Sequence, residues 1–248
     1  MFNAPCKFLF GVFMIALTDN RISQDSLAEL RKRGFEVLLM PPSASLQSGV
    51  SSHTDMLVFV GFGKLICHEE YYKSNVSLIE RIAGEARLEI TLSREQWSSN
   101  YPYDVLFNAC LVGKRLICNK KTVSRLILDE AKSQEYNIIN VPQGYTKCSV
   151  CIISDNAIIT SDKAIASACS AVGIDVLTVS EGHISLPPYS FGFIGGVGGT
   201  CGDNVYFCGS LDTHPDGDRI KDFCQKHGKR AVCLSDGELQ DVGSLFFI

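Results

Sequence analysis

The sequence HTDMLVFVGFGKLIC, at residues 53–67, places two short apolar runs on either side of a turn at residues 61–64. Such runs around a glycine-containing turn predict a pair of strands, here at residues 53–60 and 65–67. The pattern recurs where residues 104–108 precede 113–118, where 148–153 precede 157–160, and where a turn at 202–204 leads into 205–208. Residues 6–40 supply a fifth and less regular copy.

Helices with recognisable ends are predicted in three copies. Ser23 can cap a helix that Gly34 ends, and Asp162 can cap a helix over residues 164–172. A third helix is predicted between Pro215, a residue typical of a first turn, and Gly228. Third strands are predicted at residues 36–39, 137–141, 175–179 and 230–234.

A strand–strand–helix–strand unit that repeats about every 50 residues is typical of propellers and repeat arrays. Because strands and helices alternate without a linker, we expect one closed α/β domain over residues 1–248, a length near the upper limit for one core. The approximate repeats are 6–50, 53–103, 104–147, 148–199 and 200–248.

Composition excludes several classes of protein. The chain is 46% hydrophobic, with 23 basic and 27 acidic side chains and a net charge of −4. This excludes a disordered, collagen-like or coiled-coil protein, and without a basic block we expect no nucleic-acid partner. The apolar run at residues 8–17 is about half of what a bilayer-spanning helix needs, so we expect a buried strand leading into a turn at residues 18–20, and no membrane partner.

The 11 cysteines lie mostly inside apolar runs, where cysteine is usually a small buried hydrophobe. We therefore expect reduced thiols and a cytoplasmic location. Cys148 and Cys151 have Cys-x-x-Cys spacing, but no second pair completes a zinc set, so no metal site is predicted. The glycine-rich segment at residues 195–199 lacks a P-loop ending; we interpret it as a tight crossing and predict no cofactor.

Four motifs together resemble the guanidine-modifying, or pentein, superfamily: QGYTKCS at residues 143–149, GFIGG at 192–196, HPD at 214–216 and LQDVGS at 239–244. The resemblance covers almost the whole chain and is closest to a bacterial family of unknown function. It implies a five-fold pseudosymmetric α/β propeller. The superfamily includes arginine deiminases, amidinotransferases and dimethylarginine hydrolases, and a ribosome anti-association factor is a non-enzymatic member.

The resemblance also implies roles for single residues. Asp55 is placed like the acidic residue that holds the guanidinium in dimethylarginine hydrolases, and residues 104–107 match the opening of their third repeat. Thr146 stands where those enzymes have the catalytic histidine, and Phe246 or Phe247 where they have the nucleophilic cysteine. Neither residue type can perform that chemistry, so we do not expect the family's usual Cys–His mechanism.

Other residues remain candidates for a site. Cys148, beside Lys147, is the best replacement nucleophile, with His53 or His214 as its proton carrier. For the HPD motif at residues 214–216 we favour a capping role at a helix start. The candidate ligand-binding residues are Arg21, Asp55, Asn108, Thr146, Lys147, Ser149, Asp241 and Ser244.

Three functions stay open. The first is binding of a small polar or cationic metabolite, guanidino- or amino-acid-like, in a central channel. The second is a hydrolase or amidinotransferase-like enzyme with a rebuilt site, and the third is a ribosome- or protein-binding adaptor. The oligomeric state and the ligand stay undetermined. A cavity where the candidate residues converge would favour the first two, whereas a channel plugged by Phe246 and Phe247 would remove both.

Overall fold

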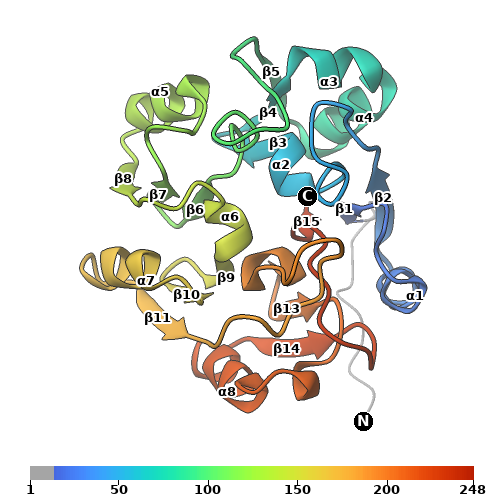
Figure 1. The fold of residues 1–248 in the computed structure, drawn as a ribbon, viewed down its shortest axis with the longest axis vertical. Helices are drawn as coiled ribbons and strands as arrows, with labels where there is room; N and C mark the ends of the chain where they lie inside the picture. The colour runs from blue at the N-terminus through green and yellow to red at the C-terminus, as the bar shows by residue number, and fades with distance from the viewer. Residues whose placement is uncertain (1–13) are drawn as a thin grey trace.

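The computed structural model describes residues 14–248 (Figure 1). The predicted strand at residues 8–17 and the predicted repeat that begins at residue 6 lie partly outside these residues. Among residues 14–248, no helix is both long enough and apolar enough to cross a bilayer.

In the part of the chain that the structure describes, fifteen strands form five three-stranded sheets. These are β15-β1-β2 (Phe246–Phe247, Ile15–Asp19, Glu36–Met40), β3-β4-β5 (Val58–Gly61, Lys64–His68, Glu89–Ser93), β6-β7-β8 (Cys110–Val112, Arg115–Cys118, Asn137–Asn140), β9-β10-β11 (Cys151–Ser154, Ala157–Thr160, Asp175–Thr178) and β12-β13-β14 (Gly198–Cys201, Asn204–Phe207, Arg230–Cys233). In each sheet the middle strand is antiparallel to one neighbour and parallel to the other.

Each parallel pair is joined by a helical crossover, because parallel strands cannot be connected by a tight turn. The crossovers are α1 (Gln24–Lys32), α3 with α4 (Glu69–Ser74, Val76–Ala86), α5 (Arg125–Ser133), α7 (Lys163–Ser170) and α8 (Gly217–Lys226). Ser23 caps α1 by accepting from the amide of Ser26, and Asp162 caps α7 by accepting from two amides. The predicted caps at Ser23 and Asp162 are confirmed, α7 ends two residues before its predicted end at residue 172, and α8 lies within its predicted range.

The first sheet is completed by the last strand of the chain. β15 pairs antiparallel with β1, with Ala16 opposite Phe247 and Leu17 opposite Phe246. In the fifth sheet, β12 contacts both β15 and β9. In Figure 1 the sheets and their crossover helices lie around the two short helices α2 (Thr54–Leu57) and α6 (Thr146–Ser149).

Three predicted strands begin later than expected. The segments that start at residues 53 and 148 lie in or beside the short helices α2 and α6, and the strands begin at Val58 and Cys151. The strand predicted at residues 104–108 is wrong, because these residues form turns and β6 begins only at Cys110. Most of these residues are buried, and in a short buried run periodicity alone cannot distinguish a strand from another conformation. A similar short helical turn, η1 (Ile194–Val197), precedes β12, whereas η2 (Leu211–Thr213) lies before α8.

The predicted turn at residues 18–20 is also corrected, because Thr18 and Asp19 belong to β1 and pair with Leu39 and Met40 of β2. The glycine-rich segment is tightly packed against backbone, as expected. A Cβ atom at Gly195 would collide with the carbonyl of Lys147, and one at Gly199 with the carbonyl of Leu245.

Candidate functional site

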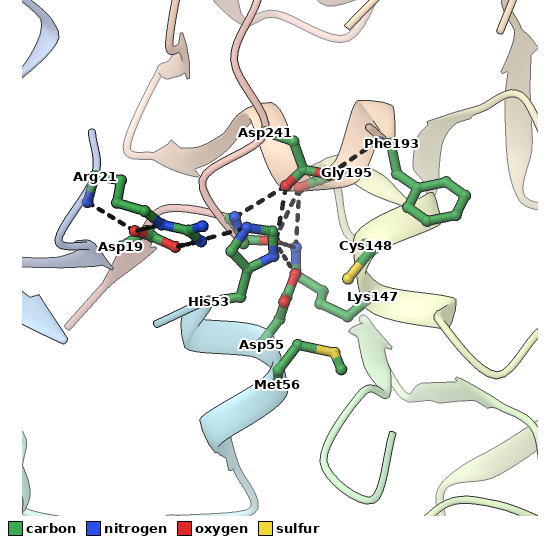
Figure 2. A network of polar contacts seen from close by, with 12 residues as sticks. Asp19, Arg21, His53, Asp55, Met56, Lys147, Cys148, Phe193, Gly195 and Asp241 are labelled. Carbon is green, nitrogen blue, oxygen red and sulfur yellow. Dashed lines mark hydrogen bonds and ion pairs between the residues drawn. The ribbon is translucent and has the colours of Figure 1, made fainter. Parts of the chain in front are cut away.

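The short helical turns and the C-terminal segment bring polar side chains together at the centre of the molecule (Figure 2). The ammonium of Lys147, on α6, donates a hydrogen bond to Ser244 Oγ at 2.7 Å. The Ser244 hydroxyl donates in turn to Asp55 Oδ2, on α2, at 2.8 Å. Ser244 has a positive φ of 70°, a backbone conformation that residues other than glycine rarely adopt. This hydrogen-bond chain links α2, α6 and the segment before β15.

Asn108 connects the same two helices from the third unit. Its Nδ2 group donates to the carbonyl of Asp55 at 3.2 Å and lies 3.0 Å from Cys148 Sγ. Its Oδ1 atom accepts from the amides of Lys147, at 2.6 Å, and Cys148, at 3.2 Å. A buried amide with both ends used in this way fixes the orientation of α6 relative to α2.

His53 lies between two buried carboxylates. Its Nδ1 is 3.8 Å from Asp241 Oδ1, and its Nε2 is 3.6 Å from Asp19 Oδ2. Asp19 is held by Arg21, whose side chain is partly exposed. Asp241 accepts from the amides of Phe193 and Gly243, at 2.8 and 3.0 Å. Within residues 14–248, neither ring nitrogen of His53 has a hydrogen-bond partner.

A cavity of about 400 Å³ reaches this group, and His53, Cys148 and Asp241 line it. The other lining residues include four aromatic side chains, Tyr145, Tyr189, Phe191 and Phe193. The rings of Tyr145 and Phe193 are stacked, with centroids 6.1 Å apart. A volume of this size suits a small metabolite.

Phe246 and Phe247 do not line this cavity. They line a separate cavity of about 220 Å³ together with Lys147. The Lys147 ammonium lies 5.6 Å from the centroid of the Phe246 ring, whereas Phe247 packs against Tyr206 and Phe35. The two phenylalanines therefore leave the larger cavity open.

Burial governs the protonation of the central groups. It raises the pKa of Asp241 to about 6, against the opposing effect of the amides of Phe193 and Gly243. It raises the pKa of Asp55 and lowers that of His53. Burial also raises the pKa of the Cys148 thiol well above its usual value, and the charges of Asp55 and Asp241 add to this shift. At neutral pH the cavity therefore presents a neutral imidazole, a neutral thiol and an ionised Asp241.

The candidate residues divide into two groups. Six of them, Asp55, Asn108, Lys147, Cys148, Asp241 and Ser244, converge with His53 as described above. Thr146 donates to the carbonyl of Gln143, and Ser149 is buried with no partner for its hydroxyl within residues 14–248, so neither lines the cavity. Arg21, a candidate ligand-binding residue, is paired with Asp19 of its own chain.

His214 is not part of this group. Its Nδ1 accepts from the amide of Asp216 at 3.0 Å, and its ring packs on His183 at the start of α8. The motif stands at the start of α8, as favoured from the sequence, but the predicted side-chain cap is not formed: Asp216 accepts from the amide of Ser180 instead. His53 is therefore the histidine beside Cys148. Neither Asp19 nor the four aromatic residues that line the cavity were predicted from the sequence as site residues. The motif GFIGG at residues 192–196, which contains Phe193, was the one sequence signal near that residue.

Comparison with other proteins identifies the relatives of the chain. No curated protein matches it. A family model described as "Family of unknown function (DUF6873)" matches residues 17–246.

Solved structures of pentein enzymes share the fold. A mutant of DDAH from Pseudomonas aeruginosa complexed with citrulline has a TM-score of 0.56 at 9% identity, covering 90% of this chain and 91% of that one. C. jejuni agmatine deiminase has a TM-score of 0.54 at 8% identity, covering 94% and 93%. An amidinotransferase from Microseira wollei in the saxitoxin biosynthetic pathway has a TM-score of 0.51 at 11% identity, covering 89% and 80%. Identities this low show the shared fold alone.

The raised pKa of Asp241 predicts a pH dependence of stability. Between the ordinary carboxyl pKa and about pH 6 the folded state binds the proton more tightly than the unfolded chain, so this group lowers the free energy of unfolding as the pH rises. The stability of the wild-type protein relative to Asp241→Asn should fall by up to about 3 kcal/mol from about pH 4 to about pH 7. Urea unfolding at several pH values measures this difference, and a difference independent of pH would contradict the shift.

Proposed function

The chain belongs to this family of unknown function on the pentein fold, and from that premise we propose that it binds a small cationic metabolite, with a guanidino or amino group, in the aromatic cavity. We propose further that the five units close into one propeller-like domain. The shared sheet of β1 and β15 and the contacts of β12 with β9 and β15 support this closure.

The observation that carries the proposal is that Asp241 has no lysine or arginine partner in direct contact within residues 14–248, although the charge of Lys147 lowers its pKa from a distance. Of the three central acids, Asp19 is paired with Arg21, and Asp55 is linked to Lys147 through Ser244. Asp241 accepts hydrogen bonds from two backbone amides and faces a histidine whose pKa burial lowers. A ligand cation would supply the charge-assisted partner that Asp241 lacks.

The walls of the cavity support the same charge preference. The faces of aromatic rings attract cations, and the exposed Tyr189 and Phe191 lie on the same cavity as Asp241. The DDAH structure contains citrulline, and we transfer from that relative only the expectation of a ligand of amino-acid size. We propose that the protein binds its ligand without the Cys–His chemistry of the pentein enzymes. By the resemblance, Thr146 stands at the position of their catalytic histidine, and Phe246 or Phe247 at that of their nucleophilic cysteine.

A reducing, cytoplasmic location fits this proposal. The buried cysteines of residues 14–248, among them Cys67, Cys110 and Cys208, are free thiols, as expected of proteins in a reducing compartment. We propose no nucleic-acid or membrane partner, in keeping with the acidic net charge of −4.

The binding prediction concerns charge. Calorimetric titration should detect binding of methylguanidine, arginine or agmatine and weaker binding of citrulline, whose ureido side chain is uncharged. The variant Asp241→Asn should lower the affinity for the cationic probes by about 10-fold to 100-fold, because a charged hydrogen bond is lost. Asp218→Asn, whose carboxylate is 95% exposed on α8, is the matched control and should bind like wild type.

One further variant makes this test decisive. Tyr189→Leu should lower the affinity for the cationic probes several-fold, because the ring face that attracts the cation is lost. This variant still tests the proposal if Asp241→Asn fails to fold. The proposed function would be refuted if both variants bound the cationic probes as tightly as wild type does. It would also be refuted if wild type bound none of the cationic probes.

A second candidate function, a hydrolase with a rebuilt site, is favoured by one observation: Cys148 and His53 meet at the cavity. A nitrogen of His53 and Cys148 Sγ lie within 4.8 Å of each other, so the histidine could carry a proton for the thiol. The high pKa of the buried thiol opposes this function, since the thiolate is the nucleophile.

Alkylation distinguishes the two functions. We expect iodoacetamide at neutral pH to modify Cys148 no faster than the buried Cys208, because burial raises the pKa of both thiols. Peptide mass spectrometry over time measures both rates in one sample. Fast, selective alkylation of Cys148 that slows in His53→Gln would favour the enzyme over the binding protein.

A further inference from the structure

We propose that His53, Asp55 and Cys148 form a zinc site at the inner end of the cavity. One nitrogen of His53, one carboxylate oxygen of Asp55 and Cys148 Sγ all lie within 4.8 Å of one another. The three residues are 1%, 0% and 3% exposed. Zinc bonds of about 2.0 Å to nitrogen or oxygen and about 2.3 Å to sulfur require only a small inward movement of such a group.

Unpartnered polar atoms point to a missing ligand at this position. Asp55 Oδ2 accepts from Ser244, but its Oδ1 has no hydrogen-bond partner within residues 14–248, and the same holds for both ring nitrogens of His53. Leaving a buried polar atom unsatisfied is costly, and such atoms are rare in native proteins. A metal ion bound by Asp55 Oδ1 and one nitrogen of His53 would satisfy two of these groups at once.

Neighbouring side chains lie beside two of the three ligands. Asp19 faces Nε2 of His53 and Asp241 faces Nδ1, so whichever nitrogen binds the ion, the other has a carboxylate nearby. The Nδ2 group of Asn108 lies 3.0 Å from Cys148 Sγ and can donate to the thiolate. Outer groups that hydrogen-bond to metal ligands are their usual support, and the two carboxylates lie just beyond hydrogen-bond distance of the ring of His53, at 3.6 and 3.8 Å.

The chemistry of the donor set selects the metal. Magnesium and calcium take oxygen ligands, whereas zinc accepts sulfur, nitrogen and oxygen together. Three protein ligands leave the fourth position of a tetrahedral zinc ion open. Because His53 and Cys148 line the cavity, that position is reached from the space proposed for the metabolite.

One consequence rests on the proposed function. A zinc ion would place positive charge beside Asp241, whose Oδ1 lies 3.8 Å from Nδ1 of His53. Zinc and a cationic metabolite should therefore exclude each other, and zinc would act as an inhibitor of metabolite binding.

The test uses the full chain and the metal alone. Titration with Zn²⁺ against a competing chelator should show one tight site in wild type, weakened at least about 10-fold in His53→Gln and in Cys148→Ser. Cys224→Ser, which replaces a buried thiol on α8 outside the cluster, is the control and should keep the affinity. With Co²⁺, wild type should show a thiolate-to-metal charge-transfer band in the near ultraviolet, and Cys148→Ser should lack it.

Three results would overturn the zinc site. The first is that wild type binds Zn²⁺ no more tightly than Cys148→Ser does. The second is that Zn²⁺ binding is lost in Cys224→Ser alone, and the third is that the Co²⁺ spectrum of wild type lacks the thiolate band. The spectrum decides the question on wild type if the variants fail to fold. The Zn²⁺ titration contains no organic ligand, so its failure would not affect the titrations with cationic probes. In the same way, failure of the cationic probes to bind would leave the zinc result valid.

Discussion

The hydrogen-bond chain from Lys147 through Ser244 to Asp55 is the interaction on which the centre of the molecule depends. Asp55 and Ser244 are 189 residues apart in the sequence, yet their side chains meet at 2.8 Å. A buried carboxylate is stable only when it is hydrogen-bonded or protonated, and its pKa rises with burial. The segment before β15 must therefore dock on α2 and α6, and this docking brings β15 beside β1 and Asp241 beside His53.

The same docking explains how a pentein fold can hold a different site. The chain has Thr146 and Phe246 or Phe247 where the resemblance places a histidine and a cysteine, and Phe246 contacts Lys147 on the side of the smaller cavity. The candidate residues Asp241, His53 and Cys148 face the larger cavity and its aromatic side chains. Fold is thus shared with guanidine-modifying enzymes, while the chemistry is set by side chains at a few positions.

Sequence patterns predicted the parts of the structure that depend on local physics. The caps at Ser23 and Asp162 act within a few residues, so the starts of α1 and α7 could be predicted. The short helices α2 and α6 could not, because each is a four-residue segment, too short to show a helical period, that leads into a buried strand. The aromatic wall was missed for another reason: Tyr145 and Tyr189 become neighbours of one cavity only through packing between distant segments.

A double-mutant cycle between Asp55 and Ser244 tests most directly whether distant parts of the chain meet at this centre. The free energy of unfolding is measured by urea for wild type, Asp55→Ala, Ser244→Ala and the double variant. If the two side chains are hydrogen-bonded, the single effects should be non-additive by about 1 kcal/mol or more. Additivity within about 0.3 kcal/mol would mean that they do not interact, and the account of the site would be wrong.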